Sequence, residues 1–267
     1  MVGELCAGLA LGPTLLGYAA QPPSWLLRGI LLVYLFAAGL EADLSAIAAR
    51  RRAVLLVAAG AFALPFAAGW AMGGLFMAAA LSITALPVLV RILSEQGLTR
   101  SAAGSVALGA AALDDLVGWA LFAGLHGVGL AMLAAFAAGA AFKGRLRLPW
   151  AAWLAPAYFA SIGLRADFAS DLDVPLTLAI LSAACATKLV GAYAGAALAG
   201  LERRDALAVA FGMNARGAME MVLAATALEA GLIGRPLFVA LVVMALVTSL
   251  MAGPGLRAFA RPVPARP

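Results

Sequence analysis

Apolar segments of about 20 residues follow one another along nearly the whole chain, and this pattern constrains the fold more than any other feature. A helix needs about 20 apolar residues to cross the hydrocarbon core of a bilayer. The chain is 65% hydrophobic and only 12% charged, whereas a soluble domain carries about 25% charged residues. The sequence therefore predicts an integral membrane protein, and its 267 residues leave room for about ten helices and no large soluble domain.

Charged residues and Gly/Pro breaks divide the apolar sequence into ten predicted spans. These are 3–19, 24–43, 53–71, 74–93, 102–123, 127–142, 149–165, 174–199, 205–229 and 233–253. An even number of spans places both termini on one side, and most of the 18 basic residues fall on that side. Because Lys and Arg concentrate in cytoplasmic loops, both termini are expected in the cytoplasm. The net charge of +5 follows from the same loops, so no nucleic-acid partner is expected.

A short sequence near the end of the second span recurs near the end of the seventh. Tyr-Leu-Phe-Ala-Ala-Gly-Leu-Glu-Ala-Asp-Leu begins at Tyr34, and Tyr-Phe-Ala-Ser-Ile-Gly-Leu-Arg-Ala-Asp-Phe begins at Tyr158. The first copy ends on the cytoplasmic side and the second on the opposite side, which predicts two inverted five-helix repeats, 1–123 and 124–255, followed by a basic cytoplasmic tail, 256–267. Inverted repeats are typical of secondary transporters. Chance similarity between two apolar helices is the alternative.

The fourth span of each half contains helix-breaking residues. Pro87 follows Ser-Ile-Thr84-Ala-Leu in the first half, and Gly-Met-Asn214-Ala-Arg216-Gly lies in the second. Proline removes an amide donor and clashes with the preceding turn. At equivalent positions of two repeats, these residues favour a pair of crossed, broken helices whose free backbone groups point into an ion site. A simple proline kink and a glycine packing contact are the alternative.

Two adjacent carboxylates lie in the middle of the fifth span. Asp114 and Asp115 are the only ionisable residues between Ser105 and Leu125. A carboxylate at the bilayer centre costs roughly 2.5–3.5 kcal/mol, so the pair suggests ion or proton handling. Lys188 lies near the middle of the eighth span, where a buried ammonium needs a partner. We expect it to pair with one of the two aspartates, with a solvated cavity as the alternative.

Arg216 and Glu220 are four residues apart on one predicted helix and are expected to pair with each other. A structural pair is favoured over direct contact with a transported ion. The sequence contains no metal-ligand cluster, nucleophile motif or phosphate-binding loop, so neither an enzyme nor a resident cofactor is expected.

Several segments, in order along the chain, resemble the monovalent cation:proton antiporters, and in particular the bacterial sodium/proton antiporters with paired aspartates. The matching segments are Gly3–Gly8, Gly12–Gly17, Gly39–Glu41, Thr84, Arg91–Leu93, Leu108–Asp115, Phe159–Gly163, Lys188 and Gly212–Gly217. The double aspartate with a downstream lysine is the specific part of this resemblance.

The resemblance implies roles for individual residues. Asp115 would bind the cation and the proton in turn, which makes it the expected site of the monovalent cation. Asp114 would be the partner of Lys188. The helix breaks at Thr84 and near Asn214 would cross beside Asp115.

The resemblance also implies an architecture. A core bundle, 53–123 and 174–253, would move against a scaffold, 3–43 and 127–165, that can also form a homodimer. Typical members have more spans, so this chain is expected to lack their first helix and the two linker helices between the repeats.

The expected function is the exchange of a monovalent cation, sodium or lithium in the first place, for protons by alternating access, with more protons than cations moved per cycle. The expected partners are these ions and the lipid bilayer, in the inner membrane if the chain is bacterial. The alternatives are a potassium/proton antiporter, a sodium-coupled organic-solute symporter and a shortened relative without transport activity.

Overall fold

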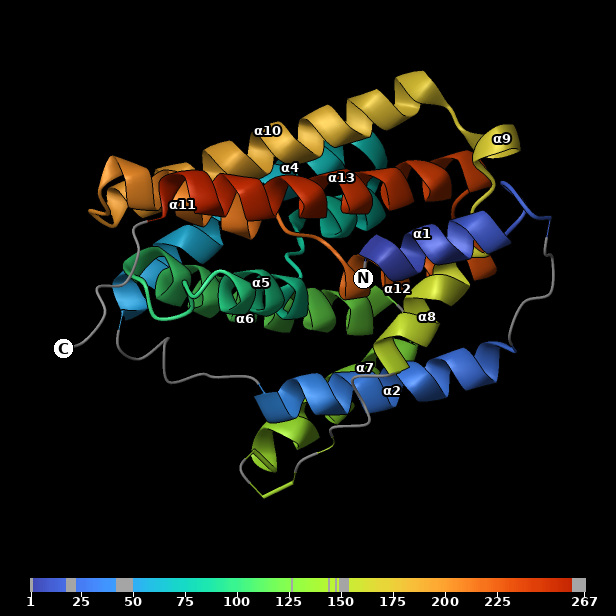
Figure 1. Cartoon of the computed structure of the whole chain (residues 1–267), viewed down its shortest axis with the longest axis horizontal. Coiled ribbons are helices and arrows are strands. Elements are labelled where there is room, and N and C mark those ends of the chain that lie inside the picture. The colour runs from blue at the N-terminus through green and yellow to red at the C-terminus, as the bar shows by residue number, and fades with distance from the viewer. Residues whose placement is uncertain are drawn as a thin grey trace. The chain divides into compact units, whose positions relative to one another are not determined.

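A computed structural model describes residues 2–17, 23–41, 50–125, 127–143, 145–146, 148 and 154–260. Every regular element in these ranges is a helix (Figure 1). Three helical segments in the described part of the chain are long and apolar enough to cross a membrane: Arg51–Glu95, Val174–Leu198 and Arg235–Phe259. The chain divides into two compact units. Unit 1 comprises Met1–Ala42, Trp119–Thr177 and Met221–Val242, and unit 2 comprises Asp43–Gly118, Leu178–Glu220 and Val243–Pro267.

Unit 1 contains two helix pairs that pack through small residues. Its helices are α1 (Val2–Leu11), α2 (Ser24–Glu41), α7 (Gly127–Ala141), α8 (Leu154–Gly163) and the short α9 (Phe168–Asp171). Helix α2 packs along α7, and α1 packs against α8 (Figure 1). A Cβ on Gly39 would lie only 2.2 Å from the Phe136 carbonyl oxygen, and one on Gly8 only 2.1 Å from that of Ala160. Glycine therefore lets these backbones touch, as is common between membrane helices.

Unit 2 contains most of the long helices and every residue of the candidate site. Its elements are α4 (Arg51–Ser82), α5 (Leu86–Glu95) and α11 (Arg203–Met213), with most of α6 (Ala102–Leu125), α10 (Val174–Leu198) and α13 (Arg235–Phe259) and the start of α12 (Ala218–Glu229). Buried Ala, Val and Leu side chains from these helices form one apolar core. Helix α4 touches α10 where Gly60 meets Gly191, because a Cβ on Gly60 would lie 2.2 Å from the Gly191 carbonyl oxygen.

Helix α4 consists of two arms. The first arm corresponds to the predicted span 53–71, and the second arm corresponds to the first part of the predicted span 74–93, which ends in α5. Gly73 and Gly74 have non-helical backbone angles, and Gly74 has a φ of 68°. The chain doubles back there, since a Cβ on Gly69 would lie 2.3 Å from the carbonyl oxygen of Met77. Glycine adopts this left-handed conformation without a steric penalty.

Several predicted boundaries differ from the structure. The predicted span 3–19 is too long, because α1 ends at Leu11. The helix ends there because Gly12 precedes Pro13, and a residue directly before a proline is disfavoured in a helix. The short α9 was not predicted. The predicted tail, 256–267, begins inside α13, which continues to Phe259, and residues 261–267 of that tail lie outside the described part of the chain.

Candidate functional site

A helix break in unit 2 separates α4 from α5. Helix α4 ends at Ser82 and α5 begins at Leu86, so Ile83, Thr84 and Ala85 are not helical. Pro87 is the second residue of α5. Proline is tolerated in a first helical turn, where the amide has no partner within the helix, and it cannot continue a helix from the preceding turn. The break therefore falls directly before the helical turn that contains Pro87, in the stretch where the sequence predicted one.

A second break separates α11 from α12. Helix α11 ends at Met213 and Asn214 is its C-cap residue, whereas α12 begins at Ala218. The two breaks contact each other through the backbone, because the Ala85 amide donates a hydrogen bond of 2.9 Å to the Ala215 carbonyl. The Thr84 hydroxyl also lies 3.2 Å from the Met213 carbonyl oxygen. Two interrupted helices thus meet at their non-helical segments.

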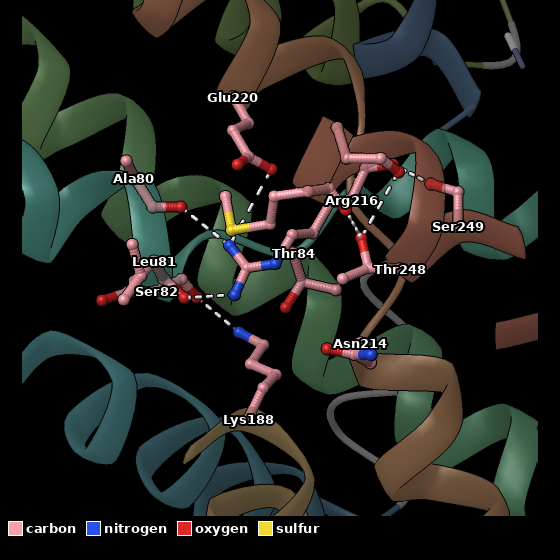
Figure 2. A network of polar contacts seen from close by, with 12 residues as sticks. Ala80, Leu81, Ser82, Thr84, Lys188, Asn214, Arg216, Glu220, Thr248 and Ser249 are labelled. Carbon is pink, nitrogen blue, oxygen red and sulfur yellow. Dashed lines mark hydrogen bonds and ion pairs between the residues drawn. The ribbon is translucent and has the colours of Figure 1, made fainter. Parts of the chain in front are cut away.

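Lys188 reaches this meeting point from α10 and is fully buried. Its Nζ donates to the Ser82 carbonyl oxygen, the last of α4 (Figure 2). The same Nζ lies 3.1 Å from Asp114 Oδ2. The Thr84 hydroxyl donates a second hydrogen bond, of 2.8 Å, to the same Asp114 oxygen. The Asp114 carboxyl group therefore contacts both an ammonium group and a neutral hydroxyl donor.

Asp115, the next residue on α6, has a different environment. Its side chain is buried, and its Oδ1 has no hydrogen-bond partner among the described residues. The backbone of Leu86, the first residue of α5, interacts with the carboxyl group. That position is favourable for an anion, since the amides at a helix N-terminus carry a partial positive charge. Asp114 forms an ion pair, whereas in the described part of the chain Asp115 forms none.

Arg216 occupies the second break and holds the end of α4. Its Nη1 donates to the Ala80 carbonyl at 2.7 Å and its Nη2 to the Leu81 carbonyl at 2.6 Å (Figure 2). The last carbonyls of a helix lack partners within the helix and carry partial negative charge. Arg216 satisfies two of them, while the Ser249 hydroxyl of α13 donates a hydrogen bond of 2.5 Å to the Arg216 carbonyl.

Two polar side chains beside the breaks have oxygen atoms without hydrogen-bond partners among the described residues. Glu220 is buried on α12 and forms the expected ion pair with Arg216, but the distance of 3.8 Å between its Oε2 and Arg216 Nη1 is too long for a hydrogen bond. Neither Glu220 oxygen has a hydrogen-bond partner among the described residues. Asn214 donates from Nδ2 to Cys185 Sγ at 3.7 Å, whereas its Oδ1 has no such partner.

The structure thus brings all eight residues singled out in the sequence into unit 2. Sequence reasoning missed the three α4 carbonyls that bind Arg216 and Lys188, because backbone groups have no sequence signal beyond the break itself. It also missed Ser249 and the contact between Cys185 and Asn214. The adjacent Thr248 and Ser249, polar residues in an otherwise apolar span, were the available signal for the first of these.

Five Asp, Glu, Lys or Arg residues are buried among the described residues, and they all belong to this site. They are Asp114, Asp115, Lys188, Arg216 and Glu220. When all five are ionised, the two positive and three negative charges give the set a net charge of −1. Uncompensated charge away from water is costly, so one bound monovalent cation or one proton would balance the site.

Comparison with known proteins identifies relatives over nearly the whole chain. The family model described as "Sodium/hydrogen exchanger, transmembrane" matches residues 1–155 and 128–261. The Na(+)/H(+)-K(+) antiporter GerN of Bacillus cereus is 26% identical over 96% of this chain and 89% of its own length. The Na(+)/H(+) antiporter NhaS4 of Synechocystis is 26% identical over 95% of this chain and 89% of its own length. The K(+)/H(+) antiporter 1 of Saccharomyces cerevisiae is 29% identical over 46% of this chain and 18% of its own length.

The alignments also show that this chain is internally shorter than these relatives. The alignment with GerN spans 347 positions, more than the 267 residues of the chain. The relative therefore has residues within the aligned region that have no counterpart here. The two matches of the family model overlap between residues 128 and 155.

Proposed function

The chain belongs to the sodium/hydrogen exchanger family, and from this premise we propose that it exchanges a monovalent cation for protons at a site centred on Asp115. The single observation that carries the assignment is the environment of Asp115. It is buried, it interacts with the backbone of Leu86 directly after the first helix break, it lacks an ion-pair partner among the described residues, and one of its oxygens accepts no hydrogen bond there.

Exchange follows from competition for this one carboxylate. An ionised Asp115 needs a positive charge, which either a proton or a cation can supply but not both at once. Binding of the cation displaces the proton, and binding of a proton displaces the cation. The backbone of the first turn of α5 interacts with the Asp115 carboxyl group. The partial positive charge at this helix end lowers the free energy of the ionised carboxylate while neither a proton nor a cation is bound to it.

The neighbouring residues have supporting roles in this proposal. Lys188 neutralises Asp114, so that Asp114 does not compete for the cation. Thr84 orients the Asp114 carboxylate through its hydroxyl group. Asn214 contributes a neutral oxygen, Oδ1, as a further cation ligand, which the absence of a hydrogen-bond partner for this atom among the described residues supports.

For the transported ion we propose sodium or lithium in the first place and potassium as the second candidate. Oxygen ligands from carboxylates and carbonyls suit hard cations, which include all three. The relatives support both choices, since they include a sodium/proton and a potassium/proton antiporter.

Alternating access would come from two inverted five-helix repeats, in which a core bundle moves against a scaffold. The paired breaks at 83–85 and 214–217 support this arrangement, because each lies in the fourth predicted span of its half. In the same proposal both termini are cytoplasmic, more protons than cations move per cycle, and the scaffold is the surface for a homodimer.

The test is transport by purified protein in liposomes, with sodium, lithium and potassium titrated separately. Parent protein is expected to produce a cation-driven pH change, and Asp115→Asn is expected to abolish it. Asp173→Asn is the matched control, because Asp173 is exposed and caps α10 through the Leu176 amide at 2.9 Å, a role that asparagine fills equally well. Undiminished exchange by Asp115→Asn would refute the assigned site, and absence of exchange by the parent with all three cations would refute the function.

A further inference from the structure

Glu220 is a buried carboxylate that the exchange at Asp115 does not use. It is 1% exposed, and both of its oxygens lack hydrogen-bond partners among the described residues. We propose that Glu220 is a second proton-binding group of the transport site, which loads and releases a proton in step with Asp115. This inference rests on the proposed cation/proton exchange and specifies which group carries the additional proton.

Arg216 forms the expected ion pair with Glu220, but it gives its hydrogen bonds to other groups. Both terminal nitrogens of Arg216 donate to backbone carbonyls, those of Ala80 and Leu81, at 2.7 and 2.6 Å. The distance of 3.8 Å between Arg216 Nη1 and Glu220 Oε2 is too long for a hydrogen bond. Charge-assisted hydrogen bonds between arginine and carboxylate are ordinarily about 2.7–2.9 Å long. The geometry is therefore that of an arginine bound to a helix end beside an unbonded carboxyl group.

The end of α4 compensates part of the charge of Arg216 without an ionised Glu220. The C-terminus of a helix carries roughly half a negative elementary charge, concentrated on its last carbonyls. Arg216 binds two of those carbonyls and Lys188 binds a third, that of Ser82. Lys188, the other cation that acts on Glu220, is also paired with Asp114 at 3.1 Å. Both cations thus have partners when Glu220 carries a proton and is neutral.

Release of the Glu220 proton adds one negative charge beside Arg216. The O–H bond of the Glu220 carboxyl group breaks, the proton leaves to water, and the carboxylate then attracts Arg216. An ionised Glu220 competes with Ala80 and Leu81 for the same guanidinium donors, which couples its ionisation to the helix break. With Asp115 and Glu220 both protonated the buried set carries one net positive charge. With both ionised and one cation bound it is neutral, so two protons exchange for one cation.

The experiment measures how the exchange depends on membrane potential. Purified full-length protein in liposomes is given opposing sodium and proton gradients, and the potential at which net flux stops is found with a potassium ionophore. An exchange of two protons for one cation moves charge and has such a reversal potential. In Glu220→Gln we expect exchange to persist with one proton per cation, so that its direction no longer responds to potential. Glu202→Gln, an exposed residue at the start of α11, should behave like the parent.

Two outcomes would overturn the proposal and leave the assignment of Asp115 intact. One is a Glu220→Gln protein with the same reversal potential as the parent. The other is a parent whose exchange is already insensitive to potential while Asp115→Asn still abolishes it. If Glu220→Gln does not fold, the infrared difference spectrum on cation addition is compared between the parent and Glu220→Asp. The protonated-carboxyl band lost by the parent should shift in the variant, and an unshifted band counts against Glu220.

Discussion

Removal of one member of the Lys188–Asp114 pair should cost far more stability than removal of both. The Nζ and Oδ2 atoms are 3.1 Å apart and neither side chain is more than 2% exposed. At an effective dielectric constant of about 20, unit charges at this distance attract by about 5 kcal/mol. Desolvation of the two ions offsets most of that gain when the pair forms, but it remains as a penalty when only one partner is removed.

The single variants should differ in a defined order. Asp114→Asn leaves an ammonium whose remaining contact is the Ser82 carbonyl oxygen, and it is expected to lose about 3–5 kcal/mol of unfolding free energy. Lys188→Met should lose less, because Asp114 can bind a proton and still accept the Thr84 hydrogen bond. The double variant should be more stable than the sum of the singles predicts, by about 2 kcal/mol or more.

The assay is reversible unfolding of the parent, the two single variants and the double variant in mixed micelles at neutral pH. The matched control is the same cycle on the exposed pair Arg91 and Glu95, at 2.9 Å. An exposed pair at this spacing should give a coupling energy below about 1 kcal/mol. A coupling energy for Lys188 and Asp114 no larger than that of the surface pair would refute the reasoning.

Two further predictions concern packing and hydrogen bonding in unit 2. Gly60→Ala places a Cβ 2.2 Å from the Gly191 carbonyl oxygen, so α4 and α10 must separate, at a cost of about 1–3 kcal/mol in the same unfolding assay. Gly29→Ala, with open space around the glycine, is the control and should not destabilise; equal stability of the two variants would contradict the close approach. Thr84→Val removes the 2.8 Å hydrogen bond to Asp114 and should cost about 1.5–3 kcal/mol. An unchanged unfolding free energy would show that this hydroxyl makes no net contribution.

The helix breaks could be predicted from the local sequence. Pro87 and the run from Gly212 to Gly217 predicted interruptions in two apolar segments, and the structure has breaks at 83–85 and 214–217. Proline and glycine act on their own backbone and on the preceding turn, so their effect can be predicted from the local sequence alone. In contrast, the tight reversal within α4 at Gly73 and Gly74 could be placed only approximately, as a gap between two spans, because its geometry depends on how closely the arms pack.

The ion-pair partners within the site could not be predicted from the local sequence. That Lys188 requires a partner follows from its position in an apolar span, since an unpaired ammonium there is costly. The sequence gives no distance, however, and two adjacent aspartates on one helix point about 100° apart. Only the packing of α6 against α10 places Asp114, and not Asp115, at 3.1 Å from the ammonium. The same packing leaves Glu220 in an ion pair with Arg216 at 3.8 Å, without a hydrogen bond between the two side chains.

By itself, the sequence determined the helical class, the membrane environment and the set of buried charges. Hydrophobic length and uncompensated charge are properties that a residue carries wherever the chain places it. The tertiary structure decided which charge meets which, and that backbone carbonyls of an interrupted helix would bind both Arg216 and Lys188. The contacts to the carbonyls join residues more than 100 positions apart, so their distances depend on the packing of whole helices and not on any local pattern.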